Sequence, residues 1–138
     1  MNWKLIFQLS SFGLIMAFAT VSLIPEHIEP FFWLVVFVIC AYIIAKSCSS
    51  KYFLHGFLVS LVNCIWITGV HIVFYKSYIA HHPDMLKMAE EHPVVPSHPR
   101  LGMLIVGPFF GAAFGLILGF FSFIASKIVT KKVAVQHK

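Results

Sequence analysis

Residues 102–132 read GMLIVGPFFGAAFGLILGFFSFIASKIVTKK. Between residues 107 and 119 glycine recurs at every fourth position, and the residues between these glycines are almost wholly apolar. In a soluble helix each glycine would cost about 1 kcal/mol relative to alanine. In a bilayer, however, glycine lets two helix backbones pack closely, and close packing is what holds helices together in lipid. The stretch therefore predicts a transmembrane helix that packs through a glycine row: Gly107, Gly111, Gly115 and Gly119.

The composition of the whole chain agrees with a membrane protein. Of its 138 residues, 59% are hydrophobic and only 11% are charged, and the mean hydropathy is +0.89. Soluble domains contain about 45–50% apolar and about 25% charged residues. The net charge of +5 does not indicate a nucleic-acid partner, because the basic residues lie at the ends of the apolar runs. The three cysteines are too few and too scattered for a disulfide framework.

Four apolar runs are long enough to cross a bilayer, which takes about 20 residues. They cover approximately residues 3–24, 31–47, 52–80 and 102–130. The longest polar segment, residues 81–100, separates the last two runs, and its residues 83–91 can form two helical turns. The sequence therefore predicts an all-α polytopic membrane protein, a four-helix transmembrane bundle with an outer loop between helices 3 and 4. Residues 1–138 form one transmembrane domain.

The basic residues are distributed unevenly between the two ends of these predicted spans. Cytoplasmic loops and termini carry an excess of lysine and arginine. Both termini are therefore expected in the cytoplasm, with the bilayer as the main partner. Seven basic residues lie on the side of the termini (Lys4, Lys46, Lys51, Lys127, Lys131, Lys132 and Lys138), and three lie on the opposite side (Lys76, Lys87 and Arg100).

The third apolar run carries a polar stripe. At 100° per residue, Ser60, Asn63, Thr68 and His71 lie towards one face of a helix. Asn63 is near the expected midplane, where polar groups usually form hydrogen bonds between helices. Two interpretations stay open: the stripe holds the bundle together, or it lines a pore or a ligand cavity. None of the four spans contains a carboxylate of the kind that proton-coupled exporters need within the membrane.

The glycine row also has two interpretations. It can pack within one monomer, with the small residues of the first span, Gly13 and Ala17, as its partner. Alternatively, it can form the interface of a homo-oligomer or of a larger membrane complex.

The outer side gathers histidines and carboxylates, which are ligands for zinc or copper. Their spacing does not match an established metal motif, so a polar loop without any cofactor is the competing interpretation. The candidate ligands are Glu26, His27, His81, His82, Glu91 and His92.

Three short motifs carry a family resemblance: His82-Pro83-Asp84-Met85, Pro99-Arg100-Leu101, and Gly107-Pro108-Phe109-Phe110-Gly111 running into Ala125-Ser126-Lys127. In these motifs the chain resembles a group of small four-span membrane proteins from Bacteroidetes. The resemblance implies a bacterial inner (plasma) membrane and no particular activity.

No hydrolase or nucleotide-binding motif is visible, so we expect no enzymatic activity. The function that we rank first is a packing, oligomeric or accessory-subunit role in the membrane. The alternatives are a small transporter or channel that uses the polar stripe, and a protein that binds metal at its outer face.

Overall fold

The computed structural model describes residues 1–136, with side chains up to Val129. Within this range the chain is all-helical and contains no strand. Four of its helices are long and apolar enough to cross a membrane. The helices are α1 (Trp3–Ser22), α2 (Glu29–Ser47), α3 (Tyr52–Val73), α4 (Tyr75–His81), α5 (Pro83–Glu91) and α6 (Pro99–Gln136). Lys138 and the side chains of Lys131 and Lys132 lie outside the described part.

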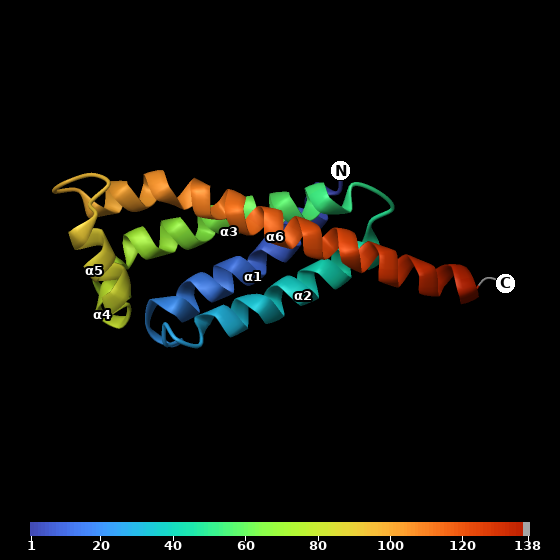
Figure 1. Cartoon of the computed structure of the whole chain (residues 1–138), viewed down its shortest axis with the longest axis horizontal. Coiled ribbons are helices and arrows are strands. Elements are labelled where there is room, and N and C mark those ends of the chain that lie inside the picture. Colours follow the sequence, from blue (N-terminus) through green and yellow to red (C-terminus); the bar gives the residue numbers. More distant parts are fainter. Residues whose placement is uncertain (137–138) are drawn as a thin grey trace.

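The four long helices run alongside one another, and the short helices gather at one end of the molecule (Figure 1). Both termini and the α2–α3 connection lie towards the opposite end, which we call the terminal end. The end that carries α4 and α5 is called the α5 end. The most extensive helix contact joins α3 to α6, followed by those of α1 with α3 and of α2 with α6. Thus α3 lies between α1 and α6 and is the central helix of the structure.

Local sequence explains where several helices begin. The Asn2 side chain accepts a hydrogen bond from the backbone N–H of Leu5 at 3.1 Å and so caps α1. Pro30 occupies the first turn of α2, and Pro83 that of α5, where the missing N–H of proline costs nothing. The predicted helical turns over residues 83–91 are confirmed as α5.

The third predicted span, residues 52–80, is not one helix. It is divided at Phe74, whose backbone leaves the helical conformation between α3 and α4. Polar residues become frequent from Tyr75 onwards. Tyr78 of α4 stacks on His71 of α3, and His82, directly after α4, contacts Glu29 of α2. The fourth predicted span is also longer than expected, because the helix already begins at Pro99 and continues to Gln136.

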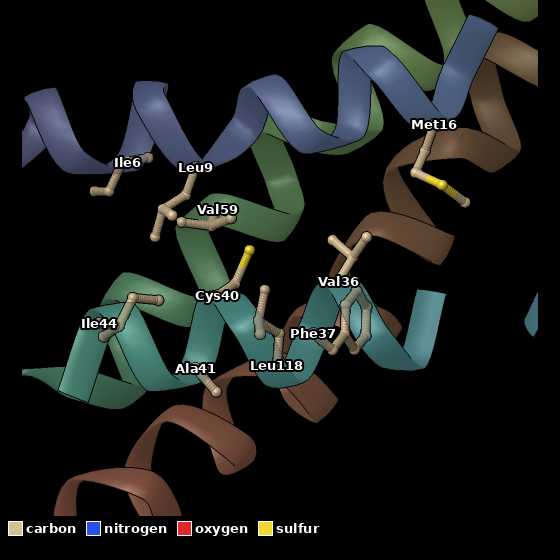
Figure 2. Packing of buried hydrophobic residues seen from close by; sticks show 10 residues of the cluster. All are labelled: Ile6, Leu9, Met16, Val36, Phe37, Cys40, Ala41, Ile44, Val59 and Leu118. Atoms are coloured by element: carbon tan, nitrogen blue, oxygen red, sulfur yellow. The ribbon is translucent and has the colours of Figure 1, made fainter. Parts of the chain in front are cut away.

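A single apolar cluster joins all four long helices (Figure 2). It includes Ile6 and Leu9 from α1, Ile44 from α2, Val59 from α3 and Leu118 from α6. The outward faces of the helices are also apolar, and several of their large side chains are more than half exposed. A water-soluble monomer rarely exposes so much contiguous apolar surface, whereas a bilayer solvates it. Examples are Phe31, Ile65, Phe109 and Phe120.

Candidate functional site

The glycine row of α6 lies directly against α3. A Cβ atom built on Gly111 would fall 2.7 Å from the Cβ of Cys64, and one on Gly115 would fall 2.8 Å from the Phe57 ring. Real Cβ atoms essentially never approach another atom within 3.0 Å. Only glycine therefore fits without displacing a neighbour. In the same way, Gly107 lies opposite Thr68, and Gly119 lies opposite Phe53.

The expectation that the first helix is the partner of this row is therefore wrong. The small face of α1 instead packs on α3, where a Cβ on Gly13 would overlap the side-chain amide of Asn63. Ala17, one turn further along α1, is fully buried. The partner of the α6 row is α3. Gly107 and Gly111 meet the small residues Thr68 and Cys64, whereas Gly115 and Gly119 meet the rings of Phe57 and Phe53. Small residues recur at every fourth position of this face of α3: Gly56, Ser60, Cys64 and Thr68.

Gly56 is a packing residue that the sequence analysis did not single out. A Cβ on Gly56 would fall 2.6 Å from the backbone oxygen of Leu118. Because glycine has no side chain, the backbone of α6 can approach α3 closely at this position. The signal was present in the sequence, because Gly56 begins the row of small residues in α3. A single glycine without repetition did not reveal it.

Two polar side chains of α3 form hydrogen bonds with the backbone of α6 across this interface. Ser60 Oγ donates to the carbonyl oxygen of Gly111 at 3.1 Å, and Cys64 Sγ donates to that of Gly107 at 2.9 Å. Thr68 Oγ1 lies 3.7 Å from Cys64 Sγ. This half of the polar stripe thus faces α6 and is occupied by contacts between helices.

The other half of the stripe faces α1. His71 Nε2 lies 2.9 Å from Thr20 Oγ1, whose hydroxyl also lies within hydrogen-bond distance of the Met16 carbonyl. Because that hydroxyl has one proton, which it can donate to the Met16 carbonyl oxygen, its oxygen can accept a hydrogen bond from the N–H of His71. Nearer the terminal end, Trp66 Nε1 donates to Ser10 Oγ at 3.2 Å. These side-chain pairs connect α3 to α1.

Asn63 of α3 faces Gly13 of α1, and its amide has no hydrogen-bond partner. Its side chain is 2% exposed, and neither its Oδ1 nor its Nδ2 forms a hydrogen bond. The expectation that Asn63 forms a hydrogen bond between helices is therefore wrong. The facing residue is Gly13, which has no side chain with which an amide could bond.

A stack of three rings closes the α5 end. The His71 and Tyr78 rings are 4.0 Å apart with an interplanar angle of 21°, and the Tyr78 and His82 rings are 4.3 Å apart at 24°. The stack is buried on its His71 and His82 sides, which are 5% and 1% exposed. The stack fixes the turn at Phe74, because His71 belongs to α3, Tyr78 belongs to α4 and His82 directly follows α4.

His82 ends the stack in a contact with Glu29 of α2, which is an ion pair when His82 is protonated. Its Nδ1 lies 2.9 Å from the Tyr78 carbonyl oxygen, and its Nε2 lies 3.1 Å from Glu29 Oε2. A carbonyl oxygen only accepts, so Nδ1 carries a proton. The contact between Nε2 and the carboxyl group requires another proton, carried by either His82 or Glu29. Glu29 also accepts a hydrogen bond from Trp33 Nε1 at 3.1 Å, so its position is fixed from two sides.

Tyr78 lies between the two histidines and is held neutral. Burial, followed by the nearby carboxylates of Glu29 and Glu26, raises the pKa of Tyr78 to about 12 from 10.0. The stack therefore presents an uncharged phenol next to the ion pair.

The six candidate metal ligands are not brought together. Among the described residues, no group of three histidine, cysteine or acidic side chains could hold a metal ion. Both ring nitrogens of His82 are already engaged, and Glu91 and His92 lie exposed at the end of α5. The other three, Glu26, His27 and His81, line an open pocket of about 340 Å³. The metal interpretation stays a prediction.

Comparison of the chain with protein-family models, with curated proteins and with solved structures found no match in any of the three. The site must therefore be interpreted from its own geometry.

Proposed function

We propose that this chain is a small integral membrane protein that acts as a structural or accessory subunit, without catalysis. Its four long helices form a transmembrane bundle with both termini in the cytoplasm. The family resemblance in its motifs makes a bacterial inner membrane the proposed location. One observation carries the proposal: the polar groups Ser60 and Cys64 of the central helix are occupied by the α6 backbone, which leaves them unavailable to a transported solute.

The exposed surface supports the same proposal. Since the glycine row is filled by α3 of the same chain, contacts with other subunits are left to the large apolar side chains on the outside. These include the phenylalanines of α6, such as Phe109, which is 73% exposed.

The first experiment tests the topology. Reporter fusions placed after Lys138 and within the loop between Pro93 and Pro99 are expected to report opposite sides of the membrane. The distribution of basic residues is the reason, with the termini on the more basic side. If both fusions report the same side, the four-span proposal is wrong.

The second experiment tests the role. The protein is purified in mild detergent for a native mass measurement, and it is also reconstituted into liposomes for an ion-flux measurement. We expect a defined assembly, either with itself or with another membrane protein, and no flux above that of empty liposomes. A monomer that conducts ions would overturn the structural role.

A small transporter or channel is the second candidate, and Asn63 is the observation that favours it. A buried amide without a hydrogen-bond partner costs about 1–3 kcal/mol, which is unusual for a purely structural residue. If Asn63 lines a path for a transported ion, the original protein should conduct in liposomes and Asn63→Leu should abolish that flux. If Asn63 has only a packing role, neither protein should show flux above that of empty liposomes.

A further inference from the structure

A groove at the α5 end is lined by one arginine, a few polar residues and several apolar ones. Its volume of about 620 Å³ lies within the range of about 300–1,000 Å³ that is typical of ligand sites. The polar lining residues are Tyr75, Ser97, His98 and Arg100, and the apolar ones are Ile72, Pro99, Leu101 and Leu104. No carboxylate lines the groove.

Arg100 is positioned over this groove without a carboxylate partner. Its guanidinium carbon lies 5.6 Å from the centre of the Tyr75 ring, a cation–π contact that directs the charged group towards the groove. In the described part of the chain Arg100 forms no ion pair, since the ion pair found there joins His82 to Glu29. A guanidinium suits a phosphate, because its parallel N–H groups bind two oxygens at once.

The position of the groove indicates which phosphate it would meet. The apolar stretch of α3 ends at Val73, and that of α6 begins at Pro99, so Arg100 lies where both helices would leave the hydrocarbon. Leu104, one turn inside, is 56% exposed and continues the groove towards the apolar side. A ligand that matches this layout has an anionic head at Arg100 and an apolar chain along Leu101 and Leu104.

We infer that this groove binds one anionic phospholipid, with its phosphate at Arg100 and an acyl chain against Ile72, Leu101 and Leu104. The inference rests on the proposed membrane location. The pocket that contains His27 and His81 provides a contrast within the same molecule. That pocket is lined by Glu26 and Asp84 and by no lysine or arginine, so it should not attract a phosphate.

The test uses native mass spectrometry of the full chain in detergent, titrated with phosphatidylglycerol, with phosphatidylcholine of the same chain length, or with inorganic phosphate. Three variants are compared with the original protein: Arg100→Gln, Leu104→Asn, and the matched control Lys76→Gln. Lys76 is exposed and basic and lies at the same end, but it does not line the groove.

We expect one retained phosphatidylglycerol per chain, weaker phosphatidylcholine binding, and no displacement by inorganic phosphate. Arg100→Gln should weaken phosphatidylglycerol binding by about tenfold, because one charge-assisted contact is lost. Leu104→Asn should weaken it less, and Lys76→Gln should leave it unchanged. A lipid-dependent rise in melting temperature should disappear in Arg100→Gln while its melting temperature without lipid stays the same.

Three results would overturn the inference. Equal weakening by Lys76→Gln and Arg100→Gln would mean diffuse attraction by surface charge. Competition by inorganic phosphate would mean that the groove binds a free anion. Equal binding of both lipids would mean that the groove does not distinguish an anionic headgroup from a zwitterionic one. Extraction of cell membranes with alkaline carbonate separates this inference from the proposed function. A chain that stays in the membrane but binds no lipid disproves only the groove.

Discussion

The central helix α3 meets α6 on one face and α1 on the other, and the two interfaces treat their polar groups differently. Against α6, Ser60 and Cys64 donate to backbone carbonyl oxygens. Against α1, Trp66 donates to the Ser10 side chain, and the amide of Asn63 has no partner. At the start of α1, the backbone N–H of Asn2 donates to His55 Nε2. None of these three α3 side chains donates to a backbone carbonyl oxygen of α1. Both interfaces contain a glycine that allows close approach. They differ in whether the glycine brings a backbone carbonyl oxygen within hydrogen-bond distance of the other helix.

This difference shows that a glycine in a helix interface does more than save space. Along α6 the glycines repeat at every fourth position, and the backbone carbonyl oxygens of two of them, Gly107 and Gly111, come within reach of α3 and accept hydrogen bonds. On α1 the single Gly13 admits the Asn63 side chain but offers it no acceptor. A repeated glycine therefore gives both packing and polar contacts, whereas an isolated one gives packing only.

The largest effect is expected on the α6 side at Leu118. This side chain is fully buried in the apolar cluster, next to the close approach at Gly56. Leu118→Ala should therefore lower the free energy of unfolding by about 2–5 kcal/mol, because it leaves a cavity. Its matched control is Ile117→Ala, since Ile117 is 44% exposed. Thermal unfolding in detergent measures both, and equal losses would show that Leu118 is not part of a packed core.

The next largest effect concerns the glycine row. Gly111→Leu should lower stability by about 1–3 kcal/mol, because the added atoms force α3 and α6 apart. Gly69→Leu is the control, because a Cβ at Gly69 meets no atom within 4 Å. The monomer itself should melt earlier in Gly111→Leu. If the monomer is unaffected and only the mass of an assembly falls, the glycine row joins separate chains. The contrast between the α3–α6 and α1–α3 interfaces of one chain would then be wrong.

A change of opposite sign is expected on the α1 side. Asn63→Leu keeps a side chain of similar shape and removes a buried amide without a partner, so it should raise stability by about 1 kcal/mol. On the α6 side, Ser60→Ala removes a formed hydrogen bond and should lower stability by about 0.6 kcal/mol. Paired melting curves in the same detergent measure both. A loss of stability in Asn63→Leu would mean that the amide has a partner, and the two interfaces would then be alike.

At neutral pH the smallest effect is expected at Tyr78, whose ionisation affects stability only in alkali. Its raised pKa means that the folded chain favours the neutral phenol, so this stability is complete below pH 10.0 and is lost as the pH rises to about 12. In an ultraviolet titration one of the four tyrosines should therefore ionise later than the rest. Tyr78→Phe should remove the late component, and Tyr75→Phe should leave it. A single early transition would show that the stack is open to water.

Much of the helical content followed from the sequence, because an apolar run of about 20 residues has few alternatives to a spanning helix. The partner of the glycine row could not be predicted, since Gly13 and Ala17 on α1 and the row that begins at Gly56 on α3 offer similar surfaces. The sequence pattern shows which face of a helix is packed. It does not show which other helix fills it.

The ring stack was predictable only in part. His71, Tyr78 and His82 are spaced seven and four residues apart, a spacing that places residues on one face of a helix. Their partner Glu29 lies 53 residues from His82 in the chain, and no local pattern connects the two. The turn at Phe74 was also missed, because apolar residues continue up to that point and hydropathy alone does not mark a break.

The order of the helix contacts has a consequence for biosynthesis. The main partner of α1 is α3, and that of α2 is α6, which is synthesised after the other three long helices. Until α6 is made, α2 lacks most of its contacts, and Ser60 and Cys64 lack their acceptors. A nascent chain arrested before Pro99 should therefore remain a loose set of inserted helices and be degraded quickly. The helix α6 therefore supplies the contacts that complete the packing of α2 and α3.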